Sequence, residues 1–287
     1  MDMSWGMLTL LTWGVADFLA RGVALRVGSL STAFLVQVLG VVVPGVALVV
    51  VMAGPGAPEV DWLPFAGYSV ATAGAIGLAY AIYYTGLERG SVSIVSSVAS
   101  AWLLVTVVVA AVVFNEPVRW EQGVLVLVVI GGVLVISLPG RGISQGPTGV
   151  GYGLTAMVFM GVALAMWKPL TEAAGPLLAV LAVRSLASLV SLGYLRVRGA
   201  ALTWPATRVG VSLLLGAAFL DAIGYVAYNV GLERSSLVLT APLAAAHPLG
   251  TIALAMLIIR ERPTLRQWVG ISLTIAGVMV LSAVSGG

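Results

Sequence analysis

The sequence predicts an all-α integral membrane protein whose ten transmembrane helices form two inverted five-helix repeats. Three observations lead to this fold class. Of the 287 residues, 60% are hydrophobic and only 9% are charged, whereas soluble domains carry roughly 25% charged residues. The chain also contains ten apolar segments long enough to cross a bilayer. Finally, the second half of the chain repeats the first.

The ten segments follow from the need of a membrane helix for about 20 mostly apolar residues. In the first half they are Ser4–Ala24, Leu30–Met52, Leu63–Leu87, Val92–Phe114 and Trp120–Leu138. In the second half they are Gly149–Trp167, Leu177–Val197, Val209–Leu232, Leu237–Ile259 and Gln267–Val284. They are twice as long as barrel strands and show no polar alternation, so strands are not expected. The first segment lacks a positive start and a cleavage site, which favours a retained span.

The repeat is clearest in the later part of each half. Tyr80–Ser137 aligns without gaps on Tyr225–Ser282, and Gly-Leu-Glu-Arg occurs in both at matching positions. The first segments also align, with Gly14 on Gly161. Shared charged residues in this alignment are not explained by the low complexity of apolar sequence.

The predicted domains are therefore residues 1–142 and residues 143–287, with five spans in each. Because five is odd, the second domain must enter the membrane with the opposite orientation. Such inverted repeats recur among secondary transporters. Two halves related in this way can exchange conformations, which gives inward-open and outward-open states of similar energy.

The distribution of basic residues predicts the orientation. Most of them follow the odd-numbered segments, namely Arg21, Arg26, Arg89, Arg141, Arg196, Arg198, Arg208, Arg260, Arg262 and Arg266. Cytoplasmic loops carry the excess of Lys and Arg. We therefore expect both termini outside the cytoplasm, in a multi-pass protein of a bacterial-type inner (cell) membrane.

Composition also limits the chemistry. Cysteine is absent, which excludes disulfides and thiolate sites, and a single histidine makes a histidine-based metal centre unexpected. No glycine-rich run is followed by Lys-Ser or Lys-Thr, so no phosphate loop is predicted. We expect no cofactor, no metal and no nucleic-acid partner. The expected partners are a small-molecule substrate and the lipid bilayer, and a monomer is compatible with the sequence.

Several motifs, repeated in the same order, resemble the ten-span EamA type of the drug/metabolite transporter superfamily. They are Trp13-Gly14 followed by Arg21, Glu116-Pro117 with Gln122 and Gly131-Gly132, Lys168 in the second half, and Glu261 with Gln267 and Ala276-Gly277. The sequence departs from the family pattern at Arg21, where Lys is usual, and at Met160, where a Trp would stand.

The resemblance implies a secondary transporter that exports amino acids or other small metabolites by alternating access. It also implies a central cavity lined by the first, third, fourth, sixth, eighth and ninth segments. The richness in Trp and Tyr is similar to that of YddG-like exporters of aromatic amino acids. The substrate and the direction stay open, so an uptake carrier or a facilitator for other metabolites or drugs is the alternative.

An intramembrane enzyme is a more distant alternative, and we do not expect one. The single histidine, His247, has no recognisable serine partner, and Asp17 and Asp221 lack a glycine-flanked context. No catalytic residue is therefore predicted.

Ionisable residues inside apolar segments are costly and mark functional sites or buried pairs. Asp17 lies one turn before Arg21, a spacing that allows a neutralised pair on one helix face. Asp221 and Arg184 lie near the middle of adjacent segments, so a structural ion pair is the favoured reading. The functional alternative is proton coupling through Asp17, Asp221 or His247, and Asp17 is also a candidate site for a substrate amine.

Aromatic residues supply the candidate substrate site. Trp residues at segment ends, such as Trp120 and Trp268, are expected to anchor the protein at the membrane interface. The deeper ones, together with a histidine beside a helix-breaking proline, are expected to bind an organic substrate. They are Trp13, Tyr80, Tyr84, Trp102, Trp167, Tyr225 and His247. Ordinary packing between helices is the alternative for each of them.

Overall fold

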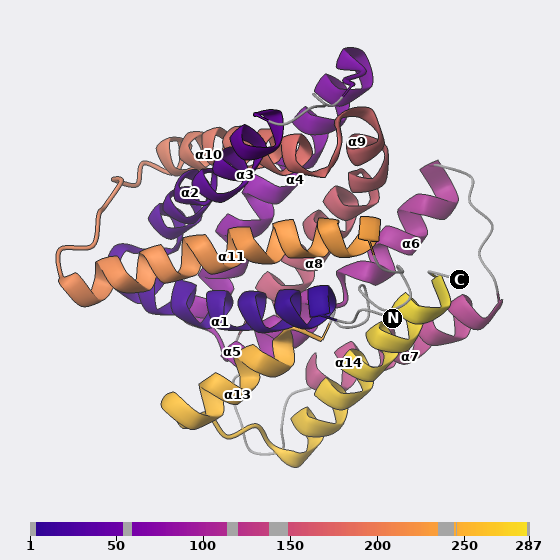
Figure 1. Ribbon diagram of the computed structural model, residues 1–287. Helices are drawn as coiled ribbons and strands as arrows, with labels where there is room; N and C mark the ends of the chain where they lie inside the picture. Colours follow the sequence, from indigo (N-terminus) through magenta and orange to yellow (C-terminus); the bar gives the residue numbers. More distant parts are fainter. Residues whose placement is uncertain are drawn as a thin grey trace.

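The computed structural model describes residues 4–53, 59–113, 120–137, 149–234, 244 and 246–285. All regular secondary structure in these residues is helical, as predicted (Figure 1). The first half forms α1 (Ser4–Val27), α2 (Ser29–Gly40), α3 (Val42–Met52), α4 (Trp62–Arg89), α5 (Val92–Ala99), α6 (Trp102–Val113) and α7 (Trp120–Ser137). The second half forms α8 (Val150–Ala165), α9 (Trp167–Ala174), α10 (Pro176–Val197), α11 (Arg208–Arg234), α13 (Pro248–Ile258) and α14 (Leu265–Ser285). The predicted domain boundary and the start of the ninth predicted segment lie outside the described residues.

The helices have the length and surface of a membrane protein. Six stretches are long and apolar enough to cross a bilayer: Ser4–Val27, Ser29–Met52, Trp62–Arg89, Val92–Val113, Pro176–Val197 and Arg208–Gly231. Four shorter apolar helices fall in the other four predicted segments. Large apolar side chains such as Val49, Leu63 and Leu257 face outward, which lipid can solvate and water cannot. The chain is a multi-pass membrane protein, and the count of ten spans stays a prediction.

Several helix pairs of one half recur when the two halves are exchanged. The contact of α1 with α11 has its counterpart in that of α8 with α4, and α1 with α13 matches α8 with α6. The pairs α2 with α10 and α7 with α14 map onto themselves, and Figure 1 shows α1 beside α11 and α7 beside α14. These pairs fit a two-fold relation between the halves and support the predicted repeat, while its inverted orientation stays a prediction.

The same turn joins the first two spans of each half. Gly28, between α1 and α2, has φ 83° and ψ 151°. Gly175, its mate in the repeat, has φ 75° and ψ 161° between α9 and α10. Only glycine adopts this region of backbone conformation without strain. The two glycines thus set the direction in which the second span of each half leaves the first.

We expect Gly28→Ala and Gly175→Ala each to lower the free energy of unfolding by about 1–3 kcal/mol, because an added Cβ strains this backbone conformation. Gly193→Ala is the matched control, since Gly193 lies in helix α10 with open space around its Cα. Thermal unfolding in detergent measures the difference. Equal melting temperatures for the three variants would contradict the backbone argument.

Both halves contain a broken helix at matching positions. In the first half, α5 ends and α6 begins around Ser100 and Ala101. In the second half, α13 begins at Pro248, directly after His247. Discontinuous helices in both repeats are typical of the substrate region of secondary transporters.

Proline at 248 cannot donate to the carbonyl of Ala244, so that carbonyl loses its usual partner within the helix. The structure instead gives it two from His247. The backbone N–H of His247 donates over 3.1 Å, and its ring Nδ1 lies 2.9 Å away. The break is therefore capped by the histidine itself, whose side chain is held in one orientation.

Two glycines let the broken helices approach closely. A Cβ on Gly14 of α1 would lie 2.8 Å from the carbonyl oxygen of His247. A Cβ on its mate, Gly161 of α8, would lie 2.5 Å from the carbonyl oxygen of Trp102. At each crossing a threonine hydroxyl also donates to the glycine carbonyl, over 3.1 Å from Thr251 and 3.0 Å from Thr106. The repeat thus places Trp102 and His247 at equivalent crossings.

Candidate functional site

A cavity lies where these helices meet, between the two halves. The empty space, including the part open to the outside, is about 520 Å³. The lining residues are Trp13 and Asp17 (α1), Ile76, Tyr80 and Tyr83 (α4), Ala99 (α5), Ser100, Trp102 (α6), Met160 and Leu164 (α8), Asp221 and Tyr225 (α11), and His247. These residues belong to the six segments that the resemblance implied.

Most residues predicted for the site meet in this wall, but two do not. Trp13, Tyr80, Trp102, Tyr225 and His247 line the cavity. The remaining two are buried outside its wall, one layer back. Tyr84 packs edge-on against Tyr80, with ring centroids 5.3 Å apart. Trp167 lies 5.6 Å from the ring of Tyr225 and donates to the side-chain oxygen of Asn229 over 2.5 Å. These two residues are placed to support the wall.

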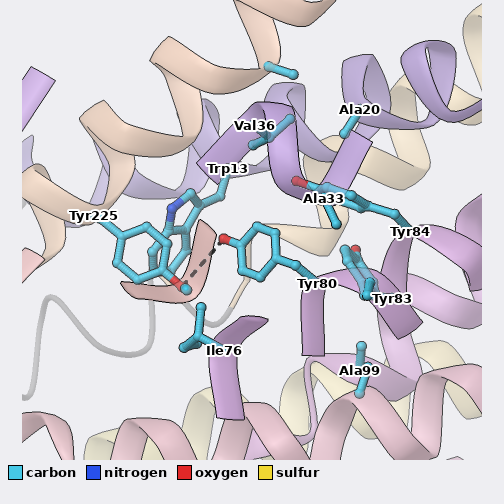
Figure 2. Close-up of a cluster of buried hydrophobic side chains, with 14 of the residues drawn as sticks. Trp13, Ala20, Ala33, Val36, Ile76, Tyr80, Tyr83, Tyr84, Ala99 and Tyr225 are labelled. Carbon is cyan, nitrogen blue, oxygen red and sulfur yellow. Dashed lines mark hydrogen bonds between the residues drawn. The ribbon is translucent and has the colours of Figure 1, made fainter. Parts of the chain in front are cut away.

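The aromatic residues of α1, α4 and α11 form one group, which Figure 2 shows. Trp13 packs at 5.0 Å against Tyr225 and at 5.6 Å against His247. The hydroxyl groups of Tyr80 and Tyr225 point toward one another and lie 3.4 Å apart. Tyr80 and Tyr225 are repeat mates, so the two halves contribute matching side chains to the centre of the site.

Other lining residues are repeat mates as well. The pairs are Trp13 with Met160, Asp17 with Leu164, Ile76 with Asp221, Tyr80 with Tyr225, and Trp102 with His247. In three of these pairs, an Asp or His in one half corresponds to an apolar or aromatic residue in the other. The ionisable groups belong to α1, α11 and the residue before α13, whereas their apolar mates belong to α4, α6 and α8. The described part of the cavity thus has matching positions on its two sides, but its carboxyl and imidazole groups lie on one.

Asp221 is neutralised by the buried ion pair that was predicted. Its Oδ2 pairs with the guanidinium of Arg184, and its Oδ1 accepts a hydrogen bond of 2.9 Å from the hydroxyl of Tyr80. Arg184 also lies 3.4 Å from Gln37 Oε1 and 5.0 Å from the ring centre of Tyr225. The guanidinium is therefore enclosed behind Tyr225, and no Lys or Arg is among the described lining residues.

Asp17 does not form the predicted pair with Arg21. The Nε of Arg21 donates over 3.0 Å to the carbonyl of Leu87, near the end of α4. The last carbonyls of a helix lack partners within the helix, so the arginine caps α4 instead of neutralising its neighbour. Asp17 accepts a hydrogen bond of 2.8 Å from the hydroxyl of Tyr83. In the described part of the chain it pairs with no Lys or Arg.

His247 reaches Asp17 from the other half of the chain. Its Nε2 lies 3.6 Å from Oδ2 of Asp17, while its Nδ1 lies 2.9 Å from the carbonyl oxygen of Ala244. Because a carbonyl only accepts, Nδ1 carries the hydrogen of a neutral ring and Nε2 is then an acceptor. Two hydrogen-bond acceptors therefore face each other across the junction of the halves.

Tyr83 lines the cavity but was not among the residues predicted for the site. It aligns with Tyr228 in the repeat. Tyr83 holds the carboxyl of Asp17 and lines the cavity, whereas Tyr228 packs against Trp13 at 5.7 Å. A buried ionisable group in one span needs a hydrogen-bond donor from another span. The polar residues of α4 were therefore the signal to search for.

In the described ranges, no three His, Asp or Glu side chains could hold a metal ion together.

Comparison with known proteins gives the family. A search of curated proteins returned no match. A solved structure described as "Crystal structure of protein" matches with a TM-score of 0.69 and 16% sequence identity, covering 99% of this chain and 96% of the other, which shows the shared fold. The model of the EamA-like transporter family matches twice, over residues 2–138 and residues 147–283. The two matches coincide with the two repeats, and the chain belongs to the EamA-like transporter family.

Proposed function

We propose that this membrane transporter exports small organic metabolites by alternating access, and that the cavity between its halves holds the substrate. The observation that carries the proposal is that the cavity is built from repeat mates at two broken helices. Equivalent crossings, Gly14 with His247 and Gly161 with Trp102, let either half adopt the packing of the other. This exchange gives two states of similar energy around one fixed site.

The lining chemistry favours a partly apolar substrate with a polar head. Trp13, Trp102 and Tyr225 present wide apolar rings, and Tyr80 and Asp17 present hydrogen-bonding groups. Aromatic and hydrophobic amino acids and their derivatives have this combination, and they are the first candidates. Tyr84 and Trp167 act from behind the wall, by holding Tyr80 and Tyr225 in place.

Of the three candidates for proton coupling, Asp17 has the best-supported environment. The negative charge of Asp221 is neutralised by Arg184, and a carboxylate in such an ion pair does not readily take up a proton. In the part of the chain that the structure describes, Asp17 has no Lys or Arg partner, and His247 lies beside it. We place the exchangeable proton on Asp17, with His247 as the neighbouring group.

Exchange of labelled substrate tests the transport proposal. The purified protein is reconstituted into liposomes, loaded with a panel of amino acids and their amine derivatives, and assayed for counterflow of the same labelled compound. Aromatic and hydrophobic members are expected to exchange faster than in protein-free liposomes. Absence of exchange for every compound, with folded protein in the membrane, would overturn the proposed function.

The orientation is tested separately. We expect a reporter that is active only in the cytoplasm to be silent when fused after Gly287, because the basic loops place both termini outside. A fusion in the loop after α10, at Arg198, is the positive control, since that loop is predicted to be cytoplasmic. Strong activity of the Gly287 fusion would show that the proposed orientation of the protein in the membrane is reversed.

A further inference from the structure

We infer that Asp17 and His247 form a subsite for the protonated amine of the substrate, and that the preferred substrates lack a free carboxylate. This inference rests on the proposed function and names the substrate class of the same cavity. It is carried by two acceptor atoms that face each other without a hydrogen bond between them, by the charge balance of the wall, and by the asymmetry between the two sides of the cavity.

The first step concerns the two acceptors. Oδ2 of Asp17 and Nε2 of His247 lie 3.6 Å apart, too far for a direct hydrogen bond. An ionised carboxylate only accepts, and Nε2 accepts because Nδ1 is committed to the carbonyl of Ala244. An alkylammonium group carries three N–H donors that point in different directions. Placed between the two side chains, it donates to both at once and also neutralises the carboxylate, which no neutral or anionic head group does.

The second step concerns charge. Among the described residues, Asp17 and Asp221 are the two acidic members of the cavity wall. Arg184 balances Asp221 and is enclosed behind Tyr225, so a substrate carboxylate meets no basic side chain from the described part of the wall. An unpaired charge in low dielectric is costly. A cationic ligand neutralises Asp17, whereas an anionic ligand adds a second uncompensated negative charge.

The third step concerns the shape of the ligand. The repeat mates of Asp17 and His247 are Leu164 and Trp102, and the repeat mate of Trp13 is Met160. These apolar mates lie on α6 and α8, which pack together, while Asp17 and His247 lie at the contact of α1 with α13. A ligand that spans the cavity therefore places its amine at the α1–α13 side and its apolar body against α6 and α8.

The aromatic surroundings also favour a cation. The ring of Trp13 lies 5.6 Å from the ring of His247 and 5.0 Å from that of Tyr225, so an ammonium group beside His247 lies near the indole ring. Cations are attracted to such faces, and most strongly to that of Trp. Figure 2 shows Trp13 beside Tyr225, next to the facing hydroxyl groups of the two tyrosines.

Three probes with the same phenyl ring separate the head groups: phenethylamine, phenylalanine and 3-phenylpropionate. Their dissociation constants are measured by calorimetry on the full-length protein in detergent. We expect phenethylamine to bind about tenfold or more tightly than phenylalanine, because it keeps the charged hydrogen bonds without an unpaired carboxylate. 3-Phenylpropionate is expected to bind most weakly. A higher or equal affinity for phenylalanine or 3-phenylpropionate would overturn the inference.

Asp17→Asn tests the assignment to this residue. The variant is expected to lose phenethylamine affinity by about tenfold or more, because the charge on the acceptor is gone. Glu59→Gln removes an exposed carboxylate outside the cavity and is expected to bind like the wild type. Unchanged affinity in folded Asp17→Asn would overturn the assignment. If that variant does not fold, the ranking of the three probes on the wild type decides alone.

The two proposals fail in different ways. Exchange of phenylalanine in liposomes, combined with weaker binding of phenethylamine, overturns the amine subsite and leaves the transport proposal standing. No binding of any of the three probes also overturns the amine subsite. Only the absence of exchange across the whole metabolite panel overturns the proposed function.

Discussion

Replacing Arg184 with methionine is expected to destabilise the protein by about 3–5 kcal/mol, because it leaves the carboxylate of Asp221 buried without its partner. Methionine has a similar length, so the loss is one of charge and hydrogen bonding and not mainly of volume. Asp221 and Arg184 are 3% and 2% exposed, so solvent cannot take over the role of the guanidinium. The expected readout is a large fall in melting temperature in detergent and in the yield of monodisperse protein.

Two comparisons sharpen this prediction. Arg196→Met changes an exposed arginine at the end of the same helix, α10, and is expected to shift the melting temperature little. Arg184→Met combined with Asp221→Leu removes both charges and is expected to recover most of the lost stability. A double variant as unstable as the single one would show that the ion pair is not the cause.

Asp17→Asn is expected to abolish the dependence of transport on a pH gradient, because asparagine cannot exchange a proton. In liposomes, wild-type transport is measured with and without an imposed gradient, at substrate concentrations above the half-saturation value of each protein. The wild type should accumulate substrate against its gradient, and the variant should only equilibrate it. Glu59→Gln, which changes an exposed carboxylate outside the cavity, is expected to keep the dependence.

The outcome distinguishes a coupled carrier from a facilitator. Equal transport by the wild type with and without the gradient would contradict proton coupling at any residue. A gradient dependence that survives in Asp17→Asn would move the proton to another group, and His247 would be the first to test because its ring lies beside Asp17.

Much of the fold follows from properties that depend on sequence alone. A span must be long and apolar enough to match the thickness of the bilayer. For this reason the six long apolar stretches of the structure coincide with predicted segments. The pairing of Arg184 with Asp221 was predictable because a charge in an apolar span needs a partner. The broken helix before α13 was visible in Pro248, whereas the break at Ser100 carries no proline signal and becomes evident only in the structure.

What the sequence could not supply is the rotation of each helix and the partner of each side chain. Spacing made Asp17 and Arg21 possible partners, but the free carbonyl of Leu87 at the end of α4 takes the arginine. The depth of a residue in its span did not distinguish residues of the cavity wall from residues that support it. Trp102 lines the cavity, whereas Trp167 packs behind Tyr225. Both outcomes depend on contacts between distant segments, which a single sequence does not encode in readable form.

The central claim is that the cavity between the halves holds the transported substrate, and one comparison tests it most directly. Transport per folded molecule is measured in liposomes for Trp102→Ala, in the cavity wall, and for Trp120→Ala, whose side chain is 76% exposed at the start of α7. Loss of one ring contact costs on the order of 1 kcal/mol, so Trp102→Ala should slow transport several-fold while Trp120→Ala leaves it unchanged. Equal effects of the two substitutions, or no effect of either, would contradict the claim and make Trp102 an ordinary packing residue.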